Sequence, residues 1–229
     1  MEQFTWKILK NRWIIIASVI VLTLFFGYQA SFLKINSDII SSLPDDDPAA
    51  SLFKNIGNDF GGNEMGMIVL ESDNVFKNDL LKHVKQITDS LKITHGVSTV
   101  TSLTNILDIK STEEGIEIGK LVDDYNLPES QSQLDSLKSY VFSKEMYKGA
   151  IVSEDGTATV VLFTLIPEVD KQAVAKGIKN KIEALKLPET IYFGGLPFMI
   201  NDVSDLIVSD IVWLLPIVFL GIWILLYFN

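Results

Sequence analysis

Two long apolar runs lie near the two ends of the chain. Residues 14–33 read IIIASVIVLTLFFGYQASFL, residues 211–229 read IVWLLPIVFLGIWILLYFN, and neither run carries a charge. At 1.5 Å rise per residue, about 20 helical residues cross a hydrocarbon core of about 30 Å. A helix also satisfies its own backbone hydrogen bonds, which lipid cannot do. The pattern therefore predicts two membrane-spanning helices, at 14–33 and 206–229.

Each run has an alternative interpretation. The first could be a cleaved signal peptide, but it exceeds the usual apolar core of about 7–15 residues, and no small-x-small cleavage site follows it. The second could be a buried core helix, but Trp213, Trp223 and Tyr227 lie near its ends, as aromatic residues do at membrane interfaces. Spanning is favoured for both runs.

Between the two runs, hydrophobic residues recur with a period of two in some segments, which is typical of strands, and with a period of 3.6 in others, which is typical of helices. Leu80, Val84, Ile87 and Leu91 recur at helical spacing, and Asp155-Gly156 between apolar runs predicts a hairpin turn. Asp170 is a candidate helix cap. Strands are predicted at 65–71, 97–103, 149–153, 157–166 and 190–193, and helices at 78–91 and from Asp170 to Leu185.

These elements predict an α+β domain over residues 34–205. Leaving 149–153 aside as an extension, the order is β-α-β-β-α-β, a ferredoxin-like arrangement with two helices on one face of a four-stranded sheet. Residues 34–62 are rich in turn residues and predict an irregular connection. Residues 113–147 predict a helical insert, broken near Pro128, whose second helix presents Leu134, Leu137 and Val141 on one face.

Charge predicts the orientation of the chain. Residues 1–13 have a net charge of +2, from Lys7, Lys10 and Arg12 against Glu2, whereas the whole chain has −10, which leaves −12 for the rest. Positive flanks stay in the cytoplasm, so the N-terminus is expected there and the acidic domain on the other side. An acidic domain disfavours nucleic acid as a partner. The chain has no cysteine and therefore no disulfide or thiolate metal site.

No candidate metal, cofactor or catalytic set stands out. Asp45, Asp46 and Asp47 lack the spaced ligands and glycine of a calcium loop, and a solvated turn is favoured. His83 and His95 have no third ligand nearby, so surface positions are favoured. Gly61-Gly62 and the run from Gly194 to Pro197 lack a Walker lysine and predict turns. We expect no enzyme activity, no cofactor and no metal.

Two groups near the second run have both a functional and a structural interpretation. Asp202, Asp205 and Asp210 could mark a substrate entrance, but favourable placement at a helix N-terminus is preferred. Met65, Met67, Phe198 and Met199 could line a path for an apolar substrate, and core packing is an equal alternative. Pro216 is expected to kink the second membrane helix.

Two stretches carry a family resemblance. Ile35 to Ser72 read INSDIISSLPDDDPAASLFKNIGNDFGGNEMGMIVLES, and Tyr192 to Pro216 read YFGGLPFMINDVSDLIVSDIVWLLP. They resemble the first extracytoplasmic domain of RND superfamily exporters, MMPL-like branch. The matching features are an aspartate, a Leu-Pro turn with acidic residues, a helix ending in Phe-Gly, the first porter strand, and a Gly-x-Pro turn before the second membrane helix. The residues are Asp38, Leu43-Pro44, Asp45 to Asp47, Phe60-Gly61, Met67 to Leu70 and Gly195 to Pro197.

The resemblance implies a proton-driven exporter of lipid or other hydrophobic compounds in a bacterial inner membrane, with this domain in the periplasm. It implies the bilayer, the remaining membrane helices and a lipid-like substrate as partners; a homo-oligomer is a further candidate. Relatives have about twelve membrane helices, with proton-relay carboxylates on later ones. Neither run here carries a charged residue, so the chain is expected to be the front part of a transporter that cannot transport alone.

Two other functions share the helix-domain-helix topology. A two-helix membrane sensor would bind a ligand outside and signal to a cytoplasmic module after residue 229. A polysaccharide chain-length regulator would have a long, helix-dominated outer domain and a proline-rich approach to the second helix. The predicted strands and the Gly-Gly-Leu-Pro turn disfavour the regulator.

Overall fold

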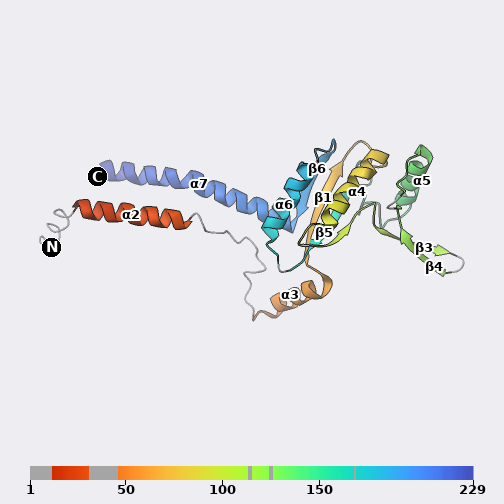
Figure 1. The fold of residues 1–229 in the computed structure, drawn as a ribbon, viewed down its shortest axis with the longest axis horizontal. Coiled ribbons are helices and arrows are strands. Elements are labelled where there is room, and N and C mark those ends of the chain that lie inside the picture. Colours follow the sequence, from red (N-terminus) through yellow and green to blue (C-terminus); the bar gives the residue numbers. More distant parts are fainter. Residues whose placement is uncertain (1–11, 31–45, 113–114, 124–125, 168, 229) are drawn as a thin grey trace. The chain divides into compact units, whose positions relative to one another are not determined.

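The computed structural model describes residues 12–30, 46–112, 115–123, 126–167 and 169–228 (Figure 1). The chain divides into two compact units, Met1–Asn36 and Ser37–Asn229. The first contains α2 (Arg12–Ala30), a 19-residue helix whose described side chains are exposed.

Among the described residues, α7 (Leu196–Phe228) is the one helix whose length and hydropathy suffice to cross a membrane, and Ile16–Gln29 of α2 forms a shorter apolar helix. The structure thus supports one of the two predicted spans, and flanking by two membrane helices is not confirmed. The α7 helix also begins earlier than the predicted boundary at residue 206, because its first turns pack on the domain.

The second unit is built on a four-stranded antiparallel sheet with the strand order β2-β5-β1-β6. Along the chain, the order is β1, α4, β2, then β5, α6, β6, which is the predicted β-α-β-β-α-β sequence of elements. The predicted α+β class is therefore confirmed. The bounds are β1 (Glu64–Glu71), α4 (Asn78–Lys92), β2 (Val97–Thr101), β5 (Ala158–Leu165), α6 (Lys171–Glu183) and β6 (Thr190–Gly195).

Helices α4 and α6 cover one face of this sheet (Figure 1). The predicted stripe of α4 is buried, and Asp170 caps α6 by accepting a hydrogen bond from the Ala173 amide at 3.0 Å, as predicted. The sheet side of this core comes from alternate residues of β1 and β5, because successive side chains of a strand point to opposite faces. These residues are Ile68, Leu70, Val161, Phe163 and Leu165.

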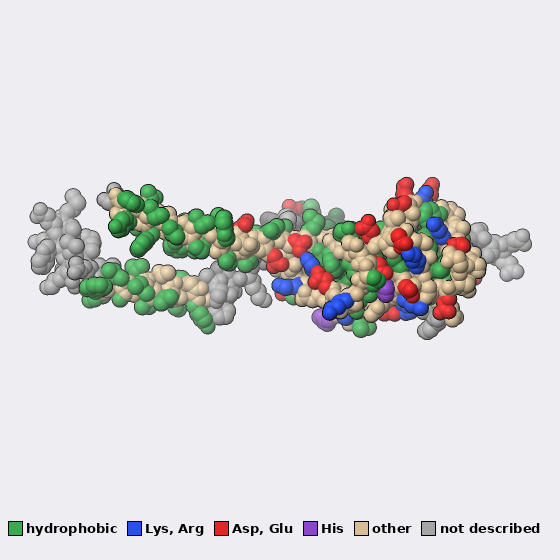
Figure 2. All heavy atoms as spheres, turned by 90° about the horizontal axis from the view of Figure 1, so that it is seen from above, with side chains coloured by type: hydrophobic (Ala, Val, Ile, Leu, Met, Phe, Trp, Pro, Cys, Tyr) green, Lys and Arg blue, Asp and Glu red, His purple; other side chains and the backbone are tan. Residues whose placement is uncertain are grey.

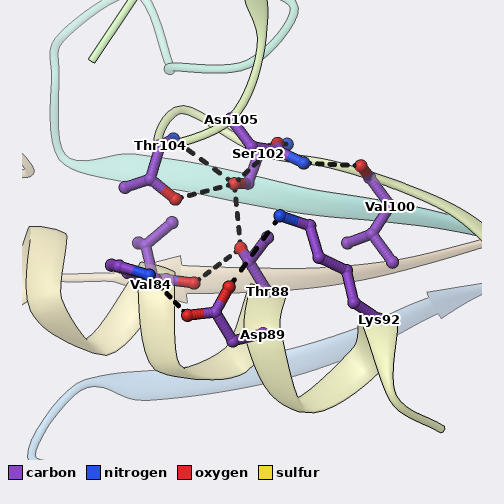
Figure 3. Close-up of polar contacts among 9 residues, drawn as sticks. Val84, Thr88, Asp89, Lys92, Val100, Ser102, Thr104 and Asn105 are labelled. Atoms are coloured by element: carbon purple, nitrogen blue, oxygen red, sulfur yellow. Dashed lines mark hydrogen bonds and ion pairs between the residues drawn. The ribbon is translucent and has the colours of Figure 1, made fainter. Parts of the chain in front are cut away.

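A buried polar cluster joins α4 to the turn that follows β2 (Figure 3). The Thr88 hydroxyl donates to the Val84 carbonyl at 2.7 Å and lies 2.8 Å from Ser102 Oγ. The Asn105 side chain accepts from the Ser102 amide at 2.6 Å and donates to the Val100 carbonyl at 2.7 Å. This turn ends β2 at Thr101, two residues before the predicted end of the strand.

The insert between β2 and β5 differs from the predicted pair of helices. Its first part is a hairpin of β3 (Leu107–Thr112) and β4 (Gly115–Lys120), and one helix, α5 (Gln131–Phe142), follows Pro128. The helical prediction before Pro128 is wrong because apolar and polar residues alternate with a period of two there. The predicted face of α5, Leu134, Leu137 and Val141, is buried and therefore confirmed.

Two further segments differ from their predictions. Residues 149–153 form turns with single bridges, such as Val152 to Thr159, rather than a strand. Within the connection predicted to be irregular, α3 (Pro48–Phe60) is a regular helix. Asp47 starts it by accepting hydrogen bonds from the Ala49 and Ala50 amides, at 2.7 and 3.3 Å, and Gly61 ends it with a positive φ of 78°.

Candidate functional site at the junction of the sheet and α7

The last strand of the sheet passes into α7 without a linker. Strand β6 ends at Gly195 and α7 begins at Leu196, while Gly195 is still paired with Gly66 of β1. Gly195 has a φ of 89°, and a Cβ atom there would lie 2.4 Å from the Met65 carbonyl oxygen. Only glycine accepts this combination of backbone angle and close approach. The sequence thus forces the chain to turn directly from the sheet into the helix.

The first turns of α7 belong to the core of the domain. Phe198, Ile200, Asn201 and Ser204 are buried. The Phe198 ring lies 5.8 Å from the ring of Phe163 and 5.1 Å from that of Phe193, between centroids. From Asp205 to Phe228 every side chain is exposed. A docked first part and an exposed apolar second part therefore form one continuous helix. Figure 2 shows the exposed part as a band of hydrophobic side chains that extends from the domain.

Polar contacts join α6 to this docked part of α7. The Gln172 side chain donates to Ser204 Oγ at 2.9 Å, and Ser204 donates in turn to the Ile200 carbonyl at 2.9 Å. On the surface, Lys179 lies 3.8 Å from Asp202. Because a hydroxyl that is buried must find partners, these contacts fix the rotation of α7 relative to α6.

A buried ion pair lies at the start of β1 on the same side of the sheet. Glu64 is 4% exposed and forms an ion pair with Lys171, the first residue of α6. Its other oxygen, Oε2, is buried and finds no hydrogen-bond donor among the described residues. Burying charge is costly unless the charge is paired, so this contact holds the start of β1 against the start of α6.

The face of the sheet that α4 and α6 leave uncovered is apolar at its centre. Met67 lies opposite Leu162, and Val69 lies opposite Val160, in the pairing of β1 with β5. These side chains are half-buried, and Met65 on the same face is 49% exposed. The solvated face of an antiparallel sheet is normally polar. We call the five residues Met65, Met67, Val69, Val160 and Leu162 the open sheet face; an apolar partner or ligand would suit it.

No protein-family model matches the chain, and no curated protein matches it in sequence. The assignment to the RND superfamily therefore rests on the residue pattern alone and stays a proposal.

The structure separates the four residues suggested for an apolar path. Met65 and Met67 belong to the open sheet face, whereas Phe198 is buried in the core on the helix-covered side. Met199 is 61% exposed on α7. The packing interpretation holds for Phe198, and no common surface unites the four.

The three aspartates predicted to precede the second membrane helix lie inside α7. Because the helix begins at Leu196, they do not occupy its N-terminus, and that interpretation is wrong. Asp202 faces Lys179, and Asp205 accepts a hydrogen bond from the Asn201 side chain at 3.5 Å. Asp210 lies among apolar residues of the exposed part of α7, and Pro216 lies within the same helix.

The remaining candidates have structural roles where they are described. His83 Nδ1 lies 2.8 Å from the Glu189 carboxylate, which joins α4 to the approach to β6. His95 is exposed. Asp45 lies outside the described residues, as do Asp38 and Leu43-Pro44, and Asp47 caps α3. Within the described ranges no group of three or more histidine or acidic side chains could hold a metal ion.

A buried carboxylate that the sequence did not single out anchors the hairpin to α5. Asp108 is 2% exposed and accepts hydrogen bonds from Tyr147 at 2.7 Å and from Tyr140 at 3.0 Å. Burial raises the pKa of Asp108, but the bonds from Tyr147 and Tyr140 and the Lys110 ammonium outweigh it, and the pKa falls below its usual value. Burial and the Asp108 carboxylate raise the pKa of Tyr147. The only sequence signal for this carboxylate is an aspartate at a polar position of the alternating run from Leu107 to Thr112.

Proposed function

We propose that this chain is the N-terminal part of a proton-driven exporter of the RND superfamily, MMPL-like branch, and that its domain handles a lipid or another hydrophobic compound outside the membrane. The observation that carries the proposal is the junction at Gly195 and Leu196. A sheet that continues into an apolar helix, with the first turns of that helix in its core, transmits helix movement to the domain. A domain that only needed anchoring would not require such a rigid connection.

Two features support the porter-type interpretation of the domain. The strand order β2-β5-β1-β6 with two helices on one face corresponds to the ferredoxin-like arrangement expected for a porter domain. The open sheet face offers an apolar surface to a substrate or to a neighbouring domain.

The proposal includes a second span over residues 14–33, a cytoplasmic N-terminus, and a periplasmic domain in a bacterial inner membrane. It places the proton-relay carboxylates on other helices, because residues 14–33 and 211–229 carry no charge. The chain alone is thus expected to insert into membranes and to transport nothing.

The test is to loosen the junction without removing any contact residue. Three glycines inserted between Gly195 and Leu196 should abolish proton-dependent efflux of a hydrophobic fluorophore from cells expressing the full-length protein, at unchanged membrane abundance. The matched control places the same insertion between Glu154 and Asp155, which are both exposed in the turn before β5, and it should leave efflux intact. Efflux that survives the junction insertion, or that is insensitive to a protonophore in the parent protein, contradicts the proposal.

The same junction also favours a second candidate, the two-helix sensor, because a signal across the membrane needs an equally stiff connection. The sensor predicts no efflux at all and a cytoplasmic output that depends on an external ligand. Measuring efflux and output in the same cells separates the two functions.

A further inference from the structure

Helix α3 buries its small residues and exposes its large apolar side chains. Ala50 and Gly57, which lie two turns apart, are its buried residues. At 3.6 residues per turn, the large apolar side chains form one stripe about 100° wide beside that buried face. They are 61%, 39%, 43% and 79% exposed, in the order Leu52, Phe53, Ile56 and Phe60. A surface helix normally turns such a stripe toward the core. We call these four residues the α3 stripe.

Contacts at the C-terminal end of α3 hold the helix in this orientation. The Asn63 side chain donates a hydrogen bond to the Phe53 carbonyl. A Cβ atom at Gly57 would displace the Asn63 side chain, so the absence of a side chain at position 57 lets the helix lie against it. A Cβ atom at Gly61 would collide with Ser98 of β2. The helix is therefore tied to the β2 edge of the sheet by its small face, and the α3 stripe is left uncovered.

Helix α3 meets the domain at the end from which α7 leaves. Only three residues separate the end of α3 at Phe60 from the start of β1 at Glu64. Glu64 forms an ion pair with Lys171 of α6, and the next residue, Gln172, donates to Ser204. Ser204 is the last buried residue of α7. The exposed apolar part of α7 thus begins level with the start of β1, where α3 ends.

The turn between α4 and β2 adds an apolar side chain at the same end of the sheet. Ile93, the residue after α4, is 81% exposed. In the same turn, the Gly96 carbonyl accepts a hydrogen bond from the Ile166 amide at 3.0 Å, directly after β5 ends. The strand order places β2 at one edge of the sheet and β6, which leads into α7, at the other. The edge opposite α7 therefore carries exposed apolar residues of its own.

We propose that the α3 stripe and Ile93 insert into the interface of the bilayer that α7 spans, so that their partner is a lipid surface. This inference rests on the proposed function, of which it uses the membrane span of α7. Because α7 leaves the domain at this end, the bilayer surface faces it. An amphipathic helix with Leu, Ile and Phe on one side lies at the boundary of head groups and acyl chains, with its apolar face buried by about 5–10 Å.

Charge and size favour lipid over a protein partner. Lys54 and Asp59 are the charged residues of α3, so the helix is neutral in a chain with a net charge of −10, and anionic head groups do not repel it. One side of a stable protein interface uses roughly 20–30 residues, far more than the α3 stripe and Ile93 supply. A lipid surface needs only the stripe. Contact at the β2 edge, together with α7 at the β6 edge, would fix the tilt of the domain over the membrane.

Single cysteines can report this contact, because the chain has no native cysteine. The full chain is reconstituted in phosphatidylcholine–phosphatidylglycerol vesicles that contain nitroxide-labelled acyl chains. A bimane label at Phe60→Cys should be quenched at least threefold more than one at Asn58→Cys. Asn58 is the matched control, because it is exposed on the opposite side of the same helix. Ile93→Cys should respond like Phe60→Cys, and quenching at the level of Asn58→Cys would remove Ile93 from the contact.

A label at Leu220→Cys, within the exposed part of α7, separates the two inferences. If it is quenched while Phe60→Cys and Asn58→Cys are quenched equally, the lipid contact is overturned and the proposed function stands. If it is not quenched, α7 does not span the bilayer and both fail. A Phe60→Cys label shielded from lipid nitroxide and from aqueous iodide alike indicates a protein cover and overturns the lipid contact.

A charge within the α3 stripe provides a second measurement. Ile56→Asp, added to Phe60→Cys, should reduce the quenching of the label to the level of Asn58→Cys, because a carboxylate keeps its water and draws the helix out of the interface. Both replaced residues are exposed, so the double variant is compatible with folding. Unchanged quenching in the double variant overturns the assignment of the stripe to lipid.

Discussion

Glu64 and Lys171 form a buried ion pair that joins the first strand of the sheet to the second of its two covering helices. The pair lies at the end of the sheet from which α7 leaves, since Gly66, two residues after Glu64, pairs with Gly195. Removing Lys171 leaves the Glu64 carboxylate buried without its cationic partner, whereas Lys171 itself is 16% exposed.

Lys171→Met is therefore expected to lower the free energy of unfolding by about 3–5 kcal/mol. Glu64→Gln should cost less, because it leaves no buried negative charge and its amide can still accept a hydrogen bond from Lys171. Denaturant unfolding of the purified protein, followed by far-ultraviolet circular dichroism, measures both. Similar small losses for the two variants would mean that the pair is solvated.

Gly195 is expected to be intolerant of a side chain. Gly195→Ala puts a Cβ against the Met65 carbonyl at a φ of 89° and should cost about 1–3 kcal/mol of stability. Gly177→Ala is the matched control: it lies in the interior of α6 with nothing within 4 Å of the new methyl group, and should stabilise the protein by about 0.5–1 kcal/mol. Thermal melts of the two variants should shift in opposite directions.

Asp108 should make stability depend on pH in the acid range. The pKa of Asp108 is lower in the folded protein than in the unfolded chain, where the pKa of an aspartate is about 3.9. The folded state therefore binds the proton less tightly. This contribution is fully present above pH 4 and is lost as the pH falls through the folded pKa. Denaturant unfolding at a series of pH values between about 2 and 6 measures the slope of the free energy of unfolding against pH.

Tyr147→Phe isolates the cause of that slope. It keeps the ring in the core and removes the hydroxyl that donates to Asp108 at 2.7 Å, so it should cost about 1.5–3 kcal/mol at neutral pH. The slope attributed to Asp108 should become shallower as well. If the variant loses the expected free energy of unfolding at neutral pH but keeps the same dependence of stability on pH, the hydroxyl contributes through packing rather than through its hydrogen bond to Asp108.

How far the sequence predicts this fold depends on how local each signal is. The stripe of α4, the Asp170 cap and the strands around Ile68 and Val161 were predictable, because periodicity and capping act within a few residues. The hairpin from Leu107 to Lys120 is hard to predict, because each of its alternating strands has only six residues and glycines interrupt the second one.

The candidate site was harder to predict, because it depends on contacts between distant segments. The sequence predicts Gly195 to be a turn residue, but the close approach of its backbone to the Met65 carbonyl depends on the pairing of β6 with β1. Nothing in the local sequence pairs Glu64 with Lys171 or Asp108 with Tyr147, which are separated by 107 and 39 residues. The position of the aspartates within α7 is not predictable locally, because the helix begins at Leu196, fifteen residues before the uncharged apolar run that starts at residue 211.

The open sheet face should bind apolar compounds, and two exposed methionines allow a matched test. Met65→Lys places a charge on this face, whereas Met199→Lys places one on the docked part of α7, away from it. Because a lysine head keeps its water and repels apolar ligands, only Met65→Lys should weaken binding of the neutral fluorophore N-phenyl-1-naphthylamine, by roughly tenfold for about 1.4 kcal/mol of lost contact. Fluorescence titration of both proteins in the same detergent measures it. Equal affinity for the two variants would exclude the open sheet face as the binding surface.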